Sequence, residues 1–205
     1  MEEGAWTIDG VACEARRYLS TRTDENARWW GERQHYLQDY ANPVVIGQVM
    51  SENDSRWSVF WCRGSRRYRP PSPNRLYTGK TVCEDRDENR ADETIGYIVF
   101  EGGPATLGGV AFEARLGGDS IRGVGNRPPY DYTFSVPFAN PPQVNLATQA
   151  GMDGNNGGWA YTYGQSVTTN AISLVIDEDQ RRDWERRHTT EQVGYVVFES
   201  PVVYP

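Results

Sequence analysis

Short stretches in which apolar and polar residues alternate recur along the whole chain, and many of their apolar members are β-branched or aromatic. Gly, Pro and Asn separate the stretches, and these residues favour tight turns. A period of two residues is typical of strands rather than of amphipathic helices. We therefore expect an all-β fold, with strands near residues 11–16, 44–50, 57–62, 77–83 and 95–101 and again near 110–115, 132–136, 144–149, 159–163, 171–176 and 193–199.

The same pattern occurs twice. Residues 3–16 read EGAWTIDGVACEAR and residues 102–115 read GGPATLGGVAFEAR, with identity at eight positions. The motif IGYIVFE at 95–101 returns as VGYVVFE at 193–199. An internal repeat of about 100 residues predicts two copies of one structural unit. We expect two tandem homologous antiparallel β-sandwich domains, at residues 1–101 and 102–205.

Further matches assign places to individual residues. Met50 and Trp57 match Met152 and Trp159, which predicts that both tryptophans occupy equivalent strand positions in the core. The segment 82–85 matches 175–178. These alignments place Cys13 opposite Phe112 and Cys83 opposite Ile176, as buried apolar residues.

Both faces of the last strand of each copy are apolar, which predicts a central, buried strand. Copy-specific insertions near 69–74 and 181–184 predict surface loops. The charged segment 17–40 is compatible with a short helix.

Composition and charge narrow the classes of partner. The chain has 205 residues and a formal net charge of −7, which argues against a nucleic-acid surface. No apolar run reaches the roughly 20 residues of a membrane-spanning helix. The start of the chain is neither basic nor apolar, so this numbering contains no signal peptide. Three cysteines without a C-x-x-C pair do not define a disulfide framework.

At these strands the chain resembles the H-type lectin-like β-sandwich. In the second copy the likeness rests on Pro141-Pro142-Gln143-Val144, on Trp159 and on the run from His188 to Tyr195, HTTEQVGY. The first copy keeps Pro43-Val44-Val45, Trp57 and ETIGY at 93–97, with Arg90 near the place of the histidine. The resemblance covers about sixty residues of each copy, and similar tandem units look like those of large microbial or algal surface proteins. It implies a six-stranded sandwich on extracellular or adhesive proteins that form oligomers and bind sugars.

Residues capable of chemistry are few. The only histidines are His35 and His188, and no Ser or Cys stands in a nucleophile-elbow context, so no catalytic or cofactor-binding residue is assigned. Asp177, Glu178 and Asp179 offer carboxylate oxygens of the kind that Ca²⁺ prefers. The competing interpretation pairs these acids with neighbouring arginines on the surface. A hydrolase would need paired carboxylates at a defined separation in a cleft, which the sequence does not specify.

We therefore expect a non-enzymatic structural protein that self-assembles outside the cell or at its surface. Candidate ligand or assembly residues are Trp184, in a charged insertion, and His188. The apolar tail that ends in Val202, Val203 and Tyr204 is expected to dock on a neighbouring domain or subunit. The alternative is a carbohydrate-binding lectin or adhesion module, for which the tryptophans would supply stacking faces. Expected partners are other copies of the chain or glycans, without nucleic acid and without a membrane span.

Overall fold

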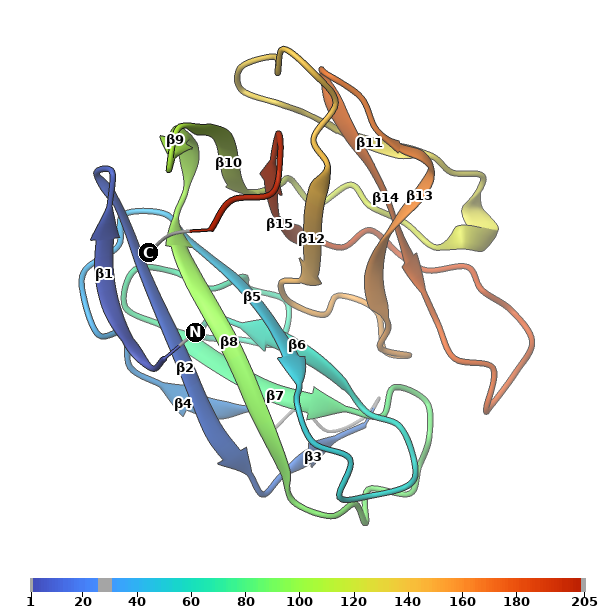
Figure 1. Cartoon of the computed structure of the whole chain (residues 1–205). Coiled ribbons are helices and arrows are strands. Elements are labelled where there is room, and N and C mark those ends of the chain that lie inside the picture. The colour runs from blue at the N-terminus through green and yellow to red at the C-terminus, as the bar shows by residue number, and fades with distance from the viewer. Residues whose placement is uncertain (1, 26–30, 204–205) are drawn as a thin grey trace.

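The computed structural model describes residues 2–25 and 31–203, and these residues form an all-β structure of small sheets (Figure 1). In the first half, sheet 2 has the strand order β1-β2-β8-β5. Its members are β1 (Gly4–Ile8), β2 (Val11–Ser20), β8 (Glu93–Glu101) and β5 (Pro43–Val49). Sheet 1 is built around β7 (Leu76–Thr81), which pairs with β6 (Val59–Arg63), β4 (Glu32–Gln34) and β3 (Thr23–Asp24).

The second half repeats this organisation. Sheet 3 has the order β9-β10-β15-β12, and sheet 4 has the order β11-β14-β13. The strands of sheet 3 are β9 (Gly103–Leu107), β10 (Val110–Leu116), β15 (Val193–Phe198) and β12 (Val144–Gln149). Those of sheet 4 are β11 (Tyr130–Thr133), β14 (Ala171–Asp177) and β13 (Trp159–Val167), and a short 3-10 turn covers Val124–Asn126. Among the described residues, the named strands pair antiparallel with one another except for the two-residue contact of β3 with β7, and two isolated parallel bridges join Cys62 to Ala150 and Gly123 to Ile176.

Strand registers agree with the sequence repeat at the first hairpin. Gly4 lies opposite Ala15 in β1–β2, and Gly103 lies opposite Ala114 in β9–β10. The predicted match of Cys13 with Phe112 is also correct, because they lie opposite Phe100 and Phe198 on the central strands. Both side chains are buried. The two halves therefore share strand order and register in their large sheets.

Three residue matches predicted from the sequence repeat do not agree with the structure, and the first is that of Met50 with Met152. The Met50 amide donates to the Thr94 carbonyl, whereas the Ala150 amide donates to the corresponding Gln192 carbonyl, so Ala150 and not Met152 is the counterpart of Met50.

The remaining shifts lie in the small sheets. Trp57 precedes β6, whereas Trp159 is the first residue of β13. Cys83 follows β7 in a left-handed turn with φ 52°, whereas Ile176 lies within β14. Insertions of a few residues in the loops account for these shifts.

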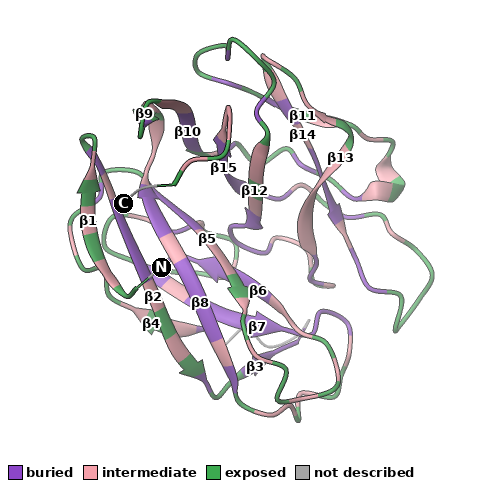
Figure 2. Ribbon diagram, in the orientation of Figure 1, coloured by how far each residue is buried: buried purple, intermediate pink, exposed green. Residues whose placement is uncertain are grey.

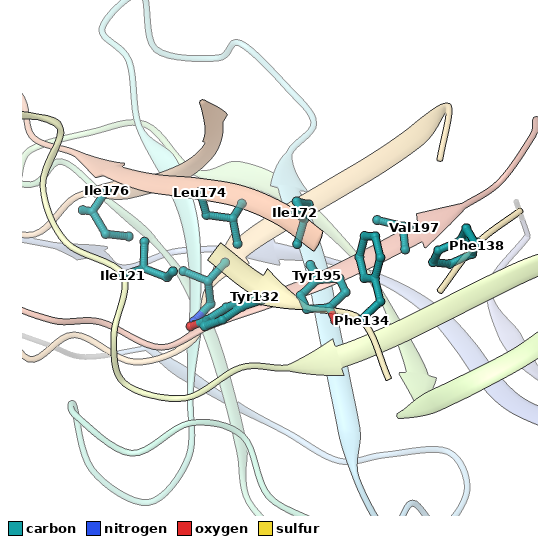
Figure 3. Close-up of a cluster of buried hydrophobic side chains, with 10 residues drawn as sticks. Ile121, Tyr132, Phe134, Phe138, Ile172, Leu174, Ile176, Tyr195 and Val197 are labelled. Carbon is teal, nitrogen blue, oxygen red and sulfur yellow. The ribbon is translucent and has the colours of Figure 1, made fainter. Parts of the chain in front are cut away.

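Three hydrophobic cores separate the sheets. One lies between sheets 1 and 2 and includes Phe60, Leu76, Tyr97 and Val99. Its counterpart between sheets 3 and 4 is shown in Figure 3, where the side chains of β11, β14 and β15 converge. A third core joins sheet 2 to sheet 3, so the sheets follow one another in a propeller-like arrangement. Its buried members are Val11, Cys13, Val44, Phe100, Leu107, Phe112, Ala114 and Val196.

The third core explains why both faces of the last strand in each half are apolar. On β8, Tyr97 and Val99 point into the core shared with sheet 1, while Phe100 points into the core shared with sheet 3. On β15, Tyr195 and Val196 divide in the same way. Each strand lies between two neighbours of its own sheet, which confirms the prediction of a central strand.

A buried glutamate fixes the same loop in each half. Glu14 accepts hydrogen bonds from the Leu37 amide at 2.7 Å and from the Tyr40 hydroxyl at 3.3 Å. Its counterpart Glu113 accepts the Ser135 amide and the Tyr195 hydroxyl. Because a buried carboxylate requires donors, the Glu-Ala-Arg motif repeats for a structural reason.

The segment 17–40 is not helical where it is described. Residues up to Ser20 continue β2, and short strands follow at β3 and β4, so the expectation of a helix was wrong. Trp29 and Trp30 lie outside the described residues. The opening strands β1 and β9 were not predicted, because half of their residues are glycine, proline or polar and their apolar alternation is short.

Candidate functional site

Two of the hollows that lie where the halves meet form the candidate site. The first is an apolar groove between sheets 2 and 3, with a volume of about 400 Å³. Met50 and Leu146 form its exposed apolar rim, 55% and 44% exposed. The Met50 sulfur rests on Gly96, where a Cβ would lie only 2.0 Å from it. We call this the inter-repeat groove. It is lined by Glu3, Ala15, Arg16, Arg17, Ile46, Gly47, Gln48, Met50, Gly96, Tyr97, Ile98, Leu146 and Ala147.

The second hollow, which we call the lateral cleft, has a volume of about 290 Å³. Strands β5 and β6 form one side of it, and β12 and β13 form the other. Gln149 lies in its wall and is 1% exposed, and neither atom of its amide has a hydrogen-bond partner within the described chain. Buried amides normally find partners, so this side chain is the most unusual polar group of the cleft. The other lining residues are Gly47, Gln48, Val49, Ser58, Val59, Phe60, Ala147, Thr148, Trp159 and Ala160.

Trp57 and Trp159 meet beside this cleft. Their ring centroids are 5.9 Å apart and the rings are nearly perpendicular, which is a favoured aromatic geometry. Trp57 is 37% exposed and Trp159 is half-buried. The prediction that both lie in the cores of their units was therefore wrong. They form an aromatic contact between the halves.

His188 is buried and lies between two buried glutamates. Its Nδ1 contacts Glu178, and its Nε2 is 2.7 Å from Oε1 of Glu191. Burial opposes protonation of His188, but the two glutamates outweigh it and raise its pKa to about 9. Glu191 also accepts the amides of Asp153 and Gly154. His188 therefore ties three loops together and is not a free ligand group.

Glu93 is the first-half counterpart of Glu191. It accepts the amides of Asn53 and Asp54 at 3.2 and 2.9 Å, as well as the Ser51 hydroxyl. The basic residue near this glutamate differs between the halves. Arg90 stands at the position of His188, but its guanidinium pairs with Asp85, with 2.9 Å between Nη2 and Oδ2. The loop-fixing role of the glutamate is repeated, whereas that of the histidine is specific to the second half.

The carboxylates of residues 177–179 have separate partners. Asp177 forms an ion pair with Arg186, and Glu178 contacts His188. Asp179 accepts the amides of Arg181 and Glu84, at 2.8 and 2.9 Å. No group of three His, Cys, Asp or Glu side chains that could hold a metal ion occurs within 2–25 and 31–203. Among the two earlier interpretations of this segment, the Asp177–Arg186 contact supports the ion-paired one.

Glu84 links the halves at a polar hollow lined by charged residues of both. Its backbone amide donates to Asp179, but both of its own carboxylate oxygens are buried and have no hydrogen-bond partner in the described part of the chain. Burial, followed by the nearby Asp183 and Asp179, raises the Glu84 pKa to about 7. Such a group resists ionisation.

The remaining candidates are exposed. Trp184 is 88% exposed, in agreement with its placement in a surface loop, and Arg181 to Asp183 are exposed beside it. In the tail Val203 is 92% exposed and Val202 is half-buried. Tyr204 lies outside the described residues. The structure does not bring Trp184, His188 and the tail together into one site.

In comparisons with known proteins, no family model, no curated protein and no solved structure matches the chain. Within the described residues, no helix has the length and apolar character needed to cross a membrane.

Sequence reasoning missed the residues that matter most at both hollows. Gln149 and Leu146 follow the alternating pattern of β12 and carry no motif of their own. Glu93 and Glu191 could have been found from the repeat, because they occupy the same position in the two copies, two residues before the first apolar residue of the Gly-Tyr strand. The contacts that form the groove and the cleft arise from the packing of one half on the other, and the sequence of a single copy does not specify that packing.

Proposed function

We propose that the chain is a tandem pair of H-type lectin-like β-sandwich units that acts as a non-enzymatic structural module. In this proposal it self-assembles outside the cell or at the cell surface. Each half supplies one sandwich, made of sheets 1 and 2 or of sheets 3 and 4.

The packing of sheet 2 on sheet 3 is the observation that carries this proposal. The two sheets have the same strand order, and they face each other through homologous residues such as Cys13 and Phe112. A sheet that packs face to face on a homologous sheet within the chain is of a kind that can also pack on a sheet of another copy.

Backbone contacts between the halves also favour a building block rather than two loosely linked domains. The Gly151 amide donates to the Cys62 carbonyl at 2.8 Å, and the Met152 amide donates to the Arg67 carbonyl at 2.9 Å. The Arg67 guanidinium donates to the Gly154 carbonyl at 2.7 Å. These hydrogen bonds connect the units directly, in addition to the linker between them.

The charged groups support the same proposal because they hold loops. Glu14 and Glu113 fix one pair of equivalent loops, and Glu93 and Glu191 fix another. His188 is enclosed by two of its neighbours. These buried charged side chains therefore stabilise the loops of each unit.

The native mass in solution tests the proposal. Sedimentation equilibrium over a wide concentration range should give a mass above that of the 23.2 kDa chain, with electron microscopy showing discrete or extended particles. A 23.2 kDa particle at every concentration would discard self-assembly.

The tail is proposed as a second contact in the assembly, because it is apolar and Val203 is nearly fully exposed. Deletion of residues 201–205 should lower the mass of the assembly or weaken it. An unchanged oligomer would remove the tail from the proposal while leaving self-assembly in place.

Glycan binding is the second candidate function, and the lateral cleft favours it. An aromatic face at Trp159, in the wall of this cleft, suits the apolar C–H surface of a sugar ring. A glycan array with and without Ca²⁺ should then give signals that Trp159→Ala abolishes, with Trp184→Ala as the matched control. Uniform silence would exclude this candidate.

A further inference from the structure

We propose that the open part of the face of sheet 2, together with the inter-repeat groove, is an interface for a second copy of this chain. The second copy would place the same face against it, which gives a dimer with twofold symmetry. This inference rests on the proposed function, for which it names the partner and the surface.

The face carries apolar side chains along its whole length, with Arg17 and Gln48 between them at the open end, and sheet 3 covers only the other end. Val44 and Phe100 lie at the covered end and are buried in the core between sheets 2 and 3. Further along the same strands Ile46 and Ile98 are only half-buried, and they line the groove. Figure 2 shows the change on β2, where buried residues give way to exposed ones toward the end of the strand.

Large apolar side chains stand on the open end. Met50 belongs to the groove, and Leu19, which is 56% exposed, follows Ala15 and Arg17 on the same side of β2 because side chains alternate along a strand. Leu146 contributes from β12 of the second half. Contiguous exposed apolar surface of this kind is typical of interaction sites.

Local charge opposes a copy of the same chain only weakly at this surface. The chain as a whole carries a net charge of −7, so two copies repel each other on average. The groove, in contrast, is lined by two arginines and one glutamate, which gives a local charge of +1. Glu3 and Arg17 lie 3.8 Å apart as a pair, so neither side chain presents an unpaired charge to the opposite copy.

Continuity with an existing interface identifies the occupant. The open face is the direct extension of the surface that packs on sheet 3, and sheet 3 is homologous to sheet 2. A second sheet 2 therefore offers the backbone twist and the strand order that this surface already accommodates inside the chain. An isologous contact also closes on itself, so each copy covers the open face of the other.

Charge-introducing variants test the surface. Met50→Glu and Leu146→Glu should each weaken self-association about tenfold or more in sedimentation equilibrium, because both would bury an unpaired charge in the interface. Val136→Glu is the matched control, since Val136 is as exposed as Leu19 but lies outside the groove. It should leave the association constant unchanged. Circular dichroism and the midpoint of urea unfolding establish that each variant is folded.

Hydrogen exchange gives a second readout that needs no variant. Peptides covering residues 17–19 and 46–50 of the full chain should become more protected as the concentration rises, whereas a peptide covering 134–138 should not. If the chain still associates in both groove variants and these peptides gain no protection, the proposed interface is wrong. Self-assembly through another surface would then remain the proposed function. If association is lost only when residues 201–205 are deleted, the groove binds the tail rather than a second sheet 2, and the proposed interface is also wrong. A wild-type chain that stays monomeric would refute the interface and the proposed function together.

Discussion

Phe100 of the first half and Phe112 of the second half pack ring against ring, with centroids 5.3 Å apart and the rings tilted by 52°. Phe112 is 1% exposed and also contacts Phe198, at 4.9 Å. One aromatic side chain thus joins the central strands of two homologous sheets. The stability of each half should depend on this contact.

Phe112→Ala should lower the free energy of unfolding by about 3–5 kcal/mol, the usual effect of removing a buried phenylalanine. Because the cavity opens between sheets 2 and 3, both halves should be affected. Urea unfolding followed by circular dichroism measures the change, and Leu37→Ala, at an exposed site, is the control. A loss below about 1 kcal/mol would mean that the two sheets are not packed as described.

His188 should make stability depend on pH. Its pKa in the folded chain is about 9, above the value of 6.5 in the unfolded chain, so it binds a proton more tightly when folded. Its contribution is therefore fully present below pH 6.5 and is lost as the pH rises through about 9. Urea unfolding between pH 7 and pH 9 should show stability falling in the wild type. His188→Gln should show a much flatter profile, and equal slopes for the two chains would contradict this prediction.

The same histidine carries a cost when it is replaced. At pH 6, His188→Gln should lower the free energy of unfolding by about 3–5 kcal/mol, because Glu178 and Glu191 lose the charge that they enclose. Replacement of the exposed His35 by Gln at the same pH is the matched control and should change little. An unaffected His188→Gln protein would show that the histidine does not tie the loops together.

Substitution of Glu84 should stabilise the chain, in contrast to substitution of His188. Its pKa of about 7 lies above the ordinary value of 4.5, so its favourable contribution is present below pH 4.5 and is lost as the pH rises through about 7. Glu84→Gln removes the ionisation and should stabilise the chain at pH 8 while having little effect at pH 4.5. Thermal unfolding at both pH values measures the difference. Destabilisation at pH 8 would indicate that the ionised carboxylate has a partner.

The contact of Trp57 with Trp159 should couple the halves measurably. A double-mutant cycle with Trp57→Ala and Trp159→Ala should give a coupling energy of about 0.5–1.5 kcal/mol, the usual value for an aromatic pair. The pair of Trp57 with Trp184, which is almost fully exposed in another loop, is the control cycle. Additive effects of the first pair would mean that the rings do not meet in solution.

Much of the fold was predictable because it rests on local alternation and on the repeat. Tyr97 and Phe100 alternate within one strand, and this alone indicated a central strand with two buried faces. The turn chemistry of Gly10 and Gly109, both with positive φ, marks the same hairpin in each half. Such features depend on neighbours in the sequence.

The candidate sites were predictable only in part, because they depend on how the halves meet. Trp57 looked like a core residue by its spacing, but loop insertions move it to the surface beside Trp159. Gln149 has no unusual neighbours in the sequence and becomes notable only when the lateral cleft leaves its amide without a partner. Trp184 was predicted to be exposed because charged residues surround it, which is a local property.

Hydrogen exchange of β8 and β15 in increasing urea tests most directly whether the homologous sheets form one body. If the core of Phe100 and Phe112 joins them, peptides covering residues 95–100 and 193–198 should lose protection in a single transition with one midpoint, and Phe112→Ala should shift both together. Two separate midpoints, with one strand still protected after the other has opened, would contradict the account.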